Sequence, residues 1–492
     1  MEKDFAISEY PDATAVTKQL DELIKKPIYS IKPEALQHYL DNYYEKKCSK
    51  SKKVIDKAVN YIPGGVQHNL AFNFPFPLVF VKAEGAYLYD LDGNRYYDFL
   101  QAGGPTVLES NPGVVREKAI EILNQCGPST GLFHEYEFKL AEKISGLMPA
   151  VEMFRMLNSG TESAMAAIRI ARLATGKKKI IKMGGAYHGW SDQLAYSIRI
   201  PGSKWTQASG VPPYIFRHTQ EFFPNDLNDL ERKLKMNRFR GGTAAVIIEP
   251  IGPESGTRPL DFNFNRGVEE LCNRYGALLI FDEVVTAFRL GPSGAQGYFN
   301  VSPDLTLFGK VVAGGYPSAG GIGGKKEYMK YLSAGISGGS KHKKALVGGT
   351  LAANPLSCVA GYHMICEMEK TGAAKKAGQA GDLLTGGLQK LIIKHGLPFV
   401  AFNQGSIVHL ETVGTMHFAI DWKRIWGIPG IMKETSKRKT EMEHMGAAYM
   451  AEGLVTLAGS RLYTSAAYTE EMIKDALAGF DRVFANVAVK EG

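Results

Sequence analysis

Hydrophobic and polar positions change rhythm along the chain, and this change predicts an α/β fold. From about residue 150, short apolar runs such as "AAVIIEP" and "ALLIFDEVV" alternate with stretches that have apolar residues at helical spacing, such as "TESAMAAIRIARLAT". Continuous apolar strands between helices predict a buried, mostly parallel sheet sandwiched by helices. Further strands of this kind are predicted at "MFRMLNSG", "KKIIKMGG" and "DLTLFGK".

The segments on either side of this region have different patterns. Residues 1–60 are predicted to form helices with polar faces, and "AYLYDLDGNRYYDFL" alternates aromatic and polar residues around Asp92-Gly93, which predicts a β-hairpin. The last hundred or so residues predict a smaller α+β unit. We therefore predict an N-terminal helical extension (1–60), a segment of a small domain with the hairpin (61–110), a large domain (111–360) and a C-terminal small α+β domain (361–492).

Composition narrows the class of protein. The chain has 492 residues, of which 45% are hydrophobic, and its net charge of +8 is too small and too dispersed to predict a nucleic-acid partner. Five scattered cysteines without metal-ligand spacing predict reduced thiols and no metal site. The polar start and the lack of a long apolar run predict no signal peptide and no membrane partner. A soluble cytoplasmic protein is the expectation.

Chemistry-bearing residues follow the predicted strands. Ligands of open parallel sheets bind beyond the carboxyl ends of the strands, where this chain has Ser159-Gly160-Thr161, Tyr187-His188, Asp282 and Lys310. Backbone N–H groups at a helix start, with the hydroxyl groups of Ser159 and Thr161, suit a phosphate. The alternative is an ordinary helix cap, and the sequence has neither a P-loop nor a dinucleotide fingerprint at this place.

Lys310 is a single charge between an apolar run and a small-residue run, "SPDLTLFGKVVAGGYPSAGG". A desolvated lysine can attack an aldehyde to form an imine, and a buried carboxylate such as Asp282 can hold a proton on a cofactor nitrogen. Together they match the demands of pyridoxal phosphate. A lysine reaching out from the core and a structural carboxylate are the alternatives. Gly309 and Gly314-Gly315 are predicted to leave room for a planar ring and for a close approach of the backbone.

Two more features fit such a cofactor. Tyr187 could stack on its ring, although an aromatic residue after a strand also suits a core position. "GGT" at 348–350 offers further phosphate donors, with a plain glycine-rich turn as the alternative.

From about residue 55 onward the chain resembles the class III aminotransferases of pyridoxal-phosphate fold type I, and within them the glutamate-1-semialdehyde aminomutase group. The resemblance rests on long stretches in the same order: "IPGGV", "YLYDLDGNRYYDF", "FRMLNSGTESAMAAIRIAR", "KIIKMGGAYHG", "VIIEP", "LIFDEVVTAFR", "PDLTLFGKVVAGG" and "GGTLAANPL". It implies a large cofactor-binding domain with a mostly parallel sheet, and a smaller α+β domain formed from the N- and C-terminal segments.

The resemblance also implies roles for single residues. Lys310 matches the Schiff-base lysine and Asp282 the partner of the pyridinium nitrogen, while Tyr187 and Val284 would cover the two ring faces. Thr350 matches a threonine that reaches the phosphate of the neighbouring subunit, which implies a homodimer. The full set of implied cofactor-binding residues is Ser159, Gly160, Thr161, Tyr187, His188, Glu254, Asp282, Val284, Lys310 and Thr350, with His188 orienting Tyr187 or the backbone.

Departures from the aminomutase pattern concern the substrate. The arginine that binds the substrate carboxylate is missing from "QHNLAFNFPFP", which holds Gln67 and His68, and Gly103 replaces an expected tryptophan. Glu254 stands where aminomutases usually have asparagine and several ω-aminotransferases have glutamate. Arg461 could bind a carboxylate, although a surface arginine is the alternative.

These observations predict a pyridoxal-phosphate-dependent aminotransferase that moves an amino group between an amino acid, or an ω-amino compound, and a keto acid or aldehyde. Lys310, Asp282 and Tyr187 are the predicted catalytic residues. An amino-acid racemase or epimerase and an aminomutase remain alternatives on the same fold. A non-catalytic phosphate-binding protein is the alternative from another class.

Overall fold

The computed structural model describes residues 4–128, 130–203, 209–333, 343–418, 428–457 and 460–490. The chain divides into two compact units. The first comprises residues 1–5, 113–374 and 419–423, and the second comprises residues 6–112, 375–418 and 424–492. Each unit has a hydrophobic core of its own.

A seven-stranded sheet forms the centre of the first unit, in the order β5-β11-β10-β9-β8-β6-β7. Every residue of the inner strands β8, β9 and β10 is buried, which explains their unbroken apolar sequences. The strands are β5 (Met153–Leu157), β6 (Lys179–Met183), β7 (Thr219–Phe222), β8 (Thr243–Ile248), β9 (Leu278–Asp282), β10 (Leu305–Gly309) and β11 (Gly320–Gly324).

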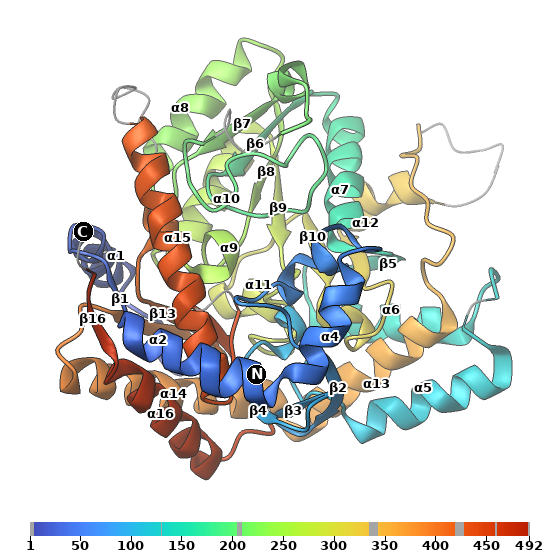
Figure 1. Ribbon diagram of the computed structural model, residues 1–492. Coiled ribbons are helices and arrows are strands. Elements are labelled where there is room, and N and C mark those ends of the chain that lie inside the picture. Colours follow the sequence, from blue (N-terminus) through green and yellow to red (C-terminus); the bar gives the residue numbers. More distant parts are fainter. Residues whose placement is uncertain are drawn as a thin grey trace. The chain divides into compact units, whose positions relative to one another are not determined.

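Helices cover this sheet, and α7 and α10 contact its inner strands (Figure 1). The small apolar residues of α7 pack on alternate residues of β8, β9 and β10. The α-helices are α5 (Gly113–Cys126), α6 (Glu135–Leu147), α7 (Gly160–Thr175), α8 (Leu227–Arg238), α9 (Pro253–Gly256), α10 (Phe264–Tyr275), α11 (Gly294–Phe299), α12 (Lys326–Met329) and α13 (Pro355–Thr371). The 3₁₀-helices are η5 (Pro213–His218), η6 (Lys310–Ala313) and η7 (Lys330–Leu332).

The second unit has three small sheets, in the orders β14-β4-β3-β2, β12-β13-β15 and β1-β16. Their strands are β1 (Tyr29–Ile31), β2 (Phe80–Glu84), β3 (Tyr87–Asp90), β4 (Arg95–Asp98), β12 (Val400–Gln404), β13 (Ile407–Glu411), β14 (Leu454–Val455), β15 (Arg461–Tyr463) and β16 (Val487–Val489). The hairpin of β3 and β4 around Asp92-Gly93 is confirmed. The strands of the second unit pair in antiparallel directions, except that β14 is parallel to β4.

The helices of this unit complete its core. They are α1 (Ala13–Leu23), α2 (Pro33–Tyr39), α3 (Glu45–Lys47), α4 (Ser49–Ala58), α14 (Ala373–Lys394), α15 (Ile428–Ala451) and α16 (Glu470–Phe484), with the π-helical η1 (Leu40–Tyr44) and the 3₁₀-helices η2 (Pro63–Gly65), η3 (Asn69–Ala71), η4 (Gln101–Gly103) and η8 (Thr415–His417). The first two residues of α14 fall in the first unit. The N-terminal helices were predicted, whereas β1, which pairs with β16 near the other end of the chain, was not.

The predicted mostly parallel sheet is confirmed, with one exception. β11 runs antiparallel to both of its neighbours, β10 and β5. Its sequence, "GGIGG", is almost free of side chains because its neighbours fill the space. A Cβ atom on Gly320 would lie 2.3 Å from the backbone nitrogen of Ser159, and one on Gly321 would lie 2.6 Å from the ring of Phe154.

Other expectations concern metals, cysteines and membranes. Within the described ranges all five cysteines are free, and no group of histidine, cysteine and carboxylate side chains could hold a metal ion. No helix of the described ranges combines the length and the apolar character needed to cross a bilayer. A cytoplasmic location stays a prediction.

Gly320 provides a test of the close packing around β11. Gly320→Ala should lower the free energy of unfolding by about 1–3 kcal/mol, because the new methyl group has to displace backbone atoms of Ser159. Denaturant unfolding measures the change. Gly146→Ala is the matched control: Gly146 lies in α6 with open space around its Cβ position, so the variant should be neutral or more stable. Equal stability of the two variants would contradict the packing.

Candidate active site

One edge of the large sheet gathers the predicted site residues of the first unit. β6, β8, β9 and β10 are parallel, and β5 has the same direction because β11 is antiparallel to both β5 and β10. The carboxyl ends of all five strands therefore lie at the same edge. Just beyond these ends stand Ser159, Tyr187, Glu249 and Lys310, and Asp282 is the last residue of β9.

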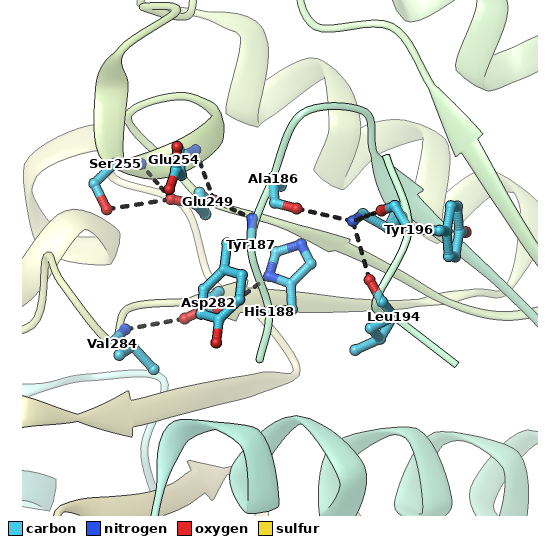
Figure 2. A network of polar contacts seen from close by, with 11 residues as sticks. Ala186, Tyr187, His188, Leu194, Tyr196, Glu249, Glu254, Ser255, Asp282 and Val284 are labelled. Atoms are coloured by element: carbon cyan, nitrogen blue, oxygen red, sulfur yellow. Dashed lines mark hydrogen bonds and ion pairs between the residues drawn. The ribbon is translucent and has the colours of Figure 1, made fainter. Parts of the chain in front are cut away.

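Asp282 and His188 form a buried pair at the centre of this edge (Figure 2). Asp282 Oδ2 lies 2.7 Å from His188 Nδ1, and Asp282 Oδ1 accepts a hydrogen bond from the backbone N–H of Val284 at 3.1 Å. Burial lowers the pKa of His188, against the opposing effect of the Asp282 carboxylate. A neutral imidazole can donate to Asp282 only through Nδ1–H, which leaves Nε2 as an acceptor. That buried Nε2 has no hydrogen-bond partner among the described residues.

Glu249 joins the loop after β6 to the loop after β8. Its carboxylate accepts hydrogen bonds from the backbone N–H groups of Tyr187 at 2.9 Å and Glu254 at 2.8 Å, and also from the backbone of Ser255 (Figure 2). Burial and the nearby charge of Asp282 raise the pKa of Glu249 to about 7, against these backbone hydrogen bonds. The carboxylate thus fixes two loops that carry predicted cofactor-binding residues.

The turn after β6 presents the Tyr187 ring at the surface. Its side chain is 45% exposed, whereas His188 is 1% exposed. Burial raises the pKa of the Tyr187 phenol, and the charges of Glu254 and Asp282 add to this effect. Gly189 is required here because its φ is +84° and a Cβ atom would lie 2.3 Å from Thr161 Oγ1. The tyrosine turn therefore lies directly against the start of α7.

The start of α7 brings Ser159, Gly160 and Thr161 to the same edge. The Ser159 hydroxyl caps the helix by accepting a hydrogen bond from Glu162 N–H, so the capping interpretation is confirmed for this residue. A Cβ atom on Gly160 would lie 2.9 Å from Val284, and one on Gly309 would lie 2.8 Å from it. Val284 is thus held between the helix start and the strand end that precedes Lys310.

Lys310 begins η6 directly after β10, with a φ of +49°. Non-glycine residues rarely adopt this left-handed conformation, and such residues gather at functional sites. Glu254 and Ser255 share it, with φ of +49° and +56°. The close backbone approach predicted here is confirmed at Gly314, whereas the room for a planar ring stays a prediction. Gly309 faces Val284, and a Cβ atom on Gly314 would lie 2.7 Å from the carbonyl oxygen of Ala360 in α13.

Thr350 is exposed, in the segment before α13. The residue before it, Gly349, passes close to the strand end after β5, because a Cβ atom there would lie 2.0 Å from Asn158 Nδ2. The role of Thr350 in a neighbouring subunit stays a prediction.

The four predicted substrate residues belong to the second unit and are described there alone. Gln67 and His68 are exposed, and His68 Nδ1 accepts a hydrogen bond from Leu70 N–H at 3.1 Å. Gly103 is buried, and its Cβ position lies 3.1 Å from Leu70 Cδ1. Arg461 lies on β15 beside His409 and donates to the Tyr463 hydroxyl at 3.3 Å, so it is partly buried rather than a surface arginine.

The sequence did not reveal three interactions of the site. His188 was expected to orient Tyr187 or the backbone, but its ring pairs with Asp282 instead. Glu249 stood at a predicted strand end, but its hydrogen bonds depend on loop shapes that no local pattern encodes. Arg199, with a φ of +67°, pairs with the Glu254 carboxylate at 3.2 Å. Its sequence context, "YSIRIPG", carries no signal for that contact.

Comparisons with known proteins agree with this geometry. The profile of the family described as Aminotransferase class-III matches residues 71–417. Glutamate-1-semialdehyde 2,1-aminomutase 1 of Lachnoclostridium phytofermentans is 35% identical over 446 residues, which cover 88% of this chain and 98% of that protein. The crystal structure of an omega-transaminase from Sphaerobacter thermophilus is 25% identical, with a TM-score of 0.78 over 90% of this chain and 99% of that one.

A glutamate-1-semialdehyde aminomutase from Pseudomonas aeruginosa PAO1 shares the fold at 20% identity, with a TM-score of 0.77 over 95% of this chain and 98% of that one. The profile match spans most of the chain, and the aminomutase relative matches nearly from end to end. The chain therefore belongs to the class III aminotransferases, a family of pyridoxal-phosphate-dependent enzymes with the type I fold.

Proposed function

We propose that this protein is a pyridoxal-phosphate-dependent aminotransferase that moves an amino group between an amino acid, or an ω-amino compound, and a keto acid or aldehyde. The observation that carries the proposal is the convergence of Asp282, Tyr187 and Lys310 at one edge of the sheet. Asp282 is the last residue of β9, Lys310 directly follows β10, and Tyr187 lies in the loop after β6.

The described residues fit this cofactor. Asp282 is a buried carboxylate held by two donors, which suits the protonated ring nitrogen of pyridoxal phosphate. Tyr187 is half-exposed, which suits an aromatic ring that stacks on a bound ring. The start of the 16-residue helix α7 has free N–H groups for a phosphate. Lys310 is only partly buried, so its amine is accessible to an aldehyde.

Each group then has a defined task. Asp282 keeps a proton on the ring nitrogen, and His188 holds the Asp282 carboxylate in place by hydrogen bonding from the side. Ser159, Gly160 and Thr161 bind the phosphate, while Tyr187 and Val284 hold the two ring faces. When bound, pyridoxal phosphate supplies an aldehyde that takes up the amino group and a ring that stores the electron pair left at Cα.

Lys310 moves the proton. With the cofactor bound, the Lys310 amine would act as the general base that removes the proton from the substrate Cα. The left-handed backbone at Lys310 fixes the direction in which its side chain leaves β10, and it thereby limits which face of the substrate is deprotonated.

An aminomutase is the second candidate, because the relative from Lachnoclostridium phytofermentans has that activity in its name. Three features favour an aminotransferase. The run with Gln67 and His68 lacks the carboxylate-binding arginine of the aminomutase pattern, and Gly103 stands where that pattern has a tryptophan. Glu254 stands at the asparagine position and pairs with Arg199.

We also propose that the protein is a homodimer in which Thr350 completes the phosphate site of the partner. The segment around Thr350 supports this: Leu346 is 83% exposed and Leu351 is 53% exposed, although both are large apolar side chains. Neighbouring apolar groups of this kind on a surface mark an interaction site.

Lys310→Ala should lower turnover at least about 100-fold, since it removes the general base. The fold should persist, because the Lys310 side chain is not part of a core cluster. Amine-dependent turnover and the melting temperature measure both effects. Borohydride should attach the cofactor covalently to the wild-type peptide that contains Lys310 and not to the variant. Lys330→Ala, an exposed lysine of the same unit, is the control. Full activity of Lys310→Ala would refute the assignment.

Dependence on an acceptor separates the candidate reactions. Purified enzyme is assayed with a panel of amino acids and ω-amino compounds, with and without a keto acid. An aminotransferase should release the keto product in catalytic amounts only when the acceptor is present. Steady turnover without an acceptor, seen as a loss of optical rotation or as an isomerised amino acid, would favour a racemase or an aminomutase instead.

Leu351→Glu should weaken the proposed dimer and, with it, the affinity for pyridoxal phosphate, because a buried carboxylate without a partner is costly at an interface. Light scattering gives the mass, and a fluorescence titration gives the affinity. Ile393→Glu is the control, because Ile393 is also exposed (79%) but lies on α14 in the other unit. A wild-type protein that is monomeric at micromolar concentration would rule out the dimer.

A further inference from the structure

A second lysine, Lys182, lies inside the first unit and has no role in the chemistry described above. It is the fourth residue of β6, and its side chain is fully buried. A buried ammonium group costs several kcal/mol unless its hydrogen bonds are satisfied. Its presence between apolar strand residues therefore needs a specific cause.

Three backbone carbonyl groups surround the Lys182 ammonium group. Nζ donates to the oxygens of Ala186 at 2.8 Å, Tyr196 at 2.7 Å and Leu194 at 3.3 Å. Figure 2 shows these three residues around one nitrogen atom. Nζ also lies 5.0 Å from the centre of the Tyr196 ring. An ammonium group has three N–H donors and a neutral amine has two, so only the charged form satisfies all three carbonyl groups.

These carbonyl groups belong to the loop that carries Tyr187 and His188. The loop from 184 to 197 has neither helix nor strand to satisfy its buried backbone, and its ends are joined by a hydrogen bond from Gly185 N–H to the Ser197 oxygen at 2.8 Å. Lys182 reaches both sides of this loop, since Ala186 directly precedes Tyr187 and Tyr196 lies near the other end. Leu194 is buried in the core between them.

The electrostatic surroundings agree with a charged side chain. Burial lowers the pKa of Lys182 to about 8, and the carboxylates of Glu221 on β7 and Glu249 after β8 oppose this effect. Lys182 stays mainly protonated at neutral pH. Burial is the main cause of the lowered pKa of His188; Asp282 opposes it, and the charge of Lys182 adds a smaller lowering effect. Full burial among carbonyl oxygens makes Lys182 unsuitable as a nucleophile, in contrast to Lys310.

We propose that Lys182 is a positioning residue: its ammonium group holds the 184–197 loop in the shape that presents Tyr187 and His188 to the cofactor. The inference rests on the proposed function, because it assumes that these two residues face the cofactor. Glu249 holds the same loop from the other side through Tyr187 N–H. Loss of Lys182 should therefore loosen the loop without unfolding the sheet.

Hydrogen exchange of the apoenzyme tests the hold on the loop. Lys182→Met keeps the length of the side chain and removes all three donors. Amide exchange in peptides covering 185–197 should become at least about 10-fold faster, whereas peptides from β8, β9 and β10 should keep their rates. Lys179→Met is the control: Lys179 starts the same strand but donates to Asn237 Oδ1 at 2.8 Å, away from the loop. Unchanged exchange in Lys182→Met, or equal acceleration throughout the sheet, would overturn the proposal.

Affinity for pyridoxal phosphate tests the consequence at the site. Lys182→Met should weaken binding by the apoenzyme about 10-fold or more, and Lys179→Met should leave it unchanged. Where Lys182→Met does not fold, Lys182→Gln, which keeps two donors on a shorter side chain, should give a smaller loss of affinity and a smaller rise in exchange. Wild-type exchange and affinity in Lys182→Gln would overturn the proposal.

Tyr187→Ala separates this inference from the proposed function. Weaker cofactor binding in Tyr187→Ala together with wild-type binding in Lys182→Met would overturn the inference alone. Wild-type binding in both variants would overturn the placement of Tyr187 at the cofactor as well.

Discussion

Charges buried at the carboxyl edge of the sheet have to be matched by fixed hydrogen-bond partners, and this requirement shapes the loops of the site. Asp282 is held by His188 and by the N–H of Val284. Glu249 is held by backbone N–H groups of two loops. Because most of these partners belong to the backbone, each charge fixes the path of the chain as well as its own position. The loops are thus ordered by the same groups that make the site polar.

The strained backbone of the site follows from this arrangement. Lys310, Glu254 and Ser255 all have positive φ, a conformation that costs free energy for residues with a side chain. Glu249 offsets part of that cost, because it binds the N–H groups of Glu254 and Ser255 directly. At Lys310, β10 on one side and the turn at Gly314 on the other fix the chain. Strain at these positions persists because the surrounding sheet is rigid.

The sequence predicted elements where a local pattern determines them, and it failed where distant groups decide. The apolar runs of β8, β9 and β10 and the helical spacing of α7 are local, and their structures are confirmed. The strand "GGIGG" was missed because runs of glycine usually indicate turns. Here glycine is needed because Phe154 and Ser159 come close from other elements. Close approaches were predicted at Gly309 and Gly314, but only the folded chain shows that Val284 and the Ala360 carbonyl group are the neighbours.

The same distinction between local patterns and distant contacts applies to the residues of the site. Order along the chain and the parallel direction of the strands were enough to predict that Asp282, Tyr187 and Lys310 share one edge. Contacts such as Arg199 with Glu254, or Lys182 with three carbonyl groups, depend on the path of irregular loops and leave no pattern in the sequence. The two kinds of residue are also expected to differ in function. The groups set by strand direction are those proposed to serve the cofactor chemistry that the family shares, whereas a loop contact such as Arg199 with Glu254 can change with little effect on the sheet. Loop residues are therefore where one member of the family can differ from another in its substrate, which is why membership in the family constrains the cofactor more tightly than the reaction.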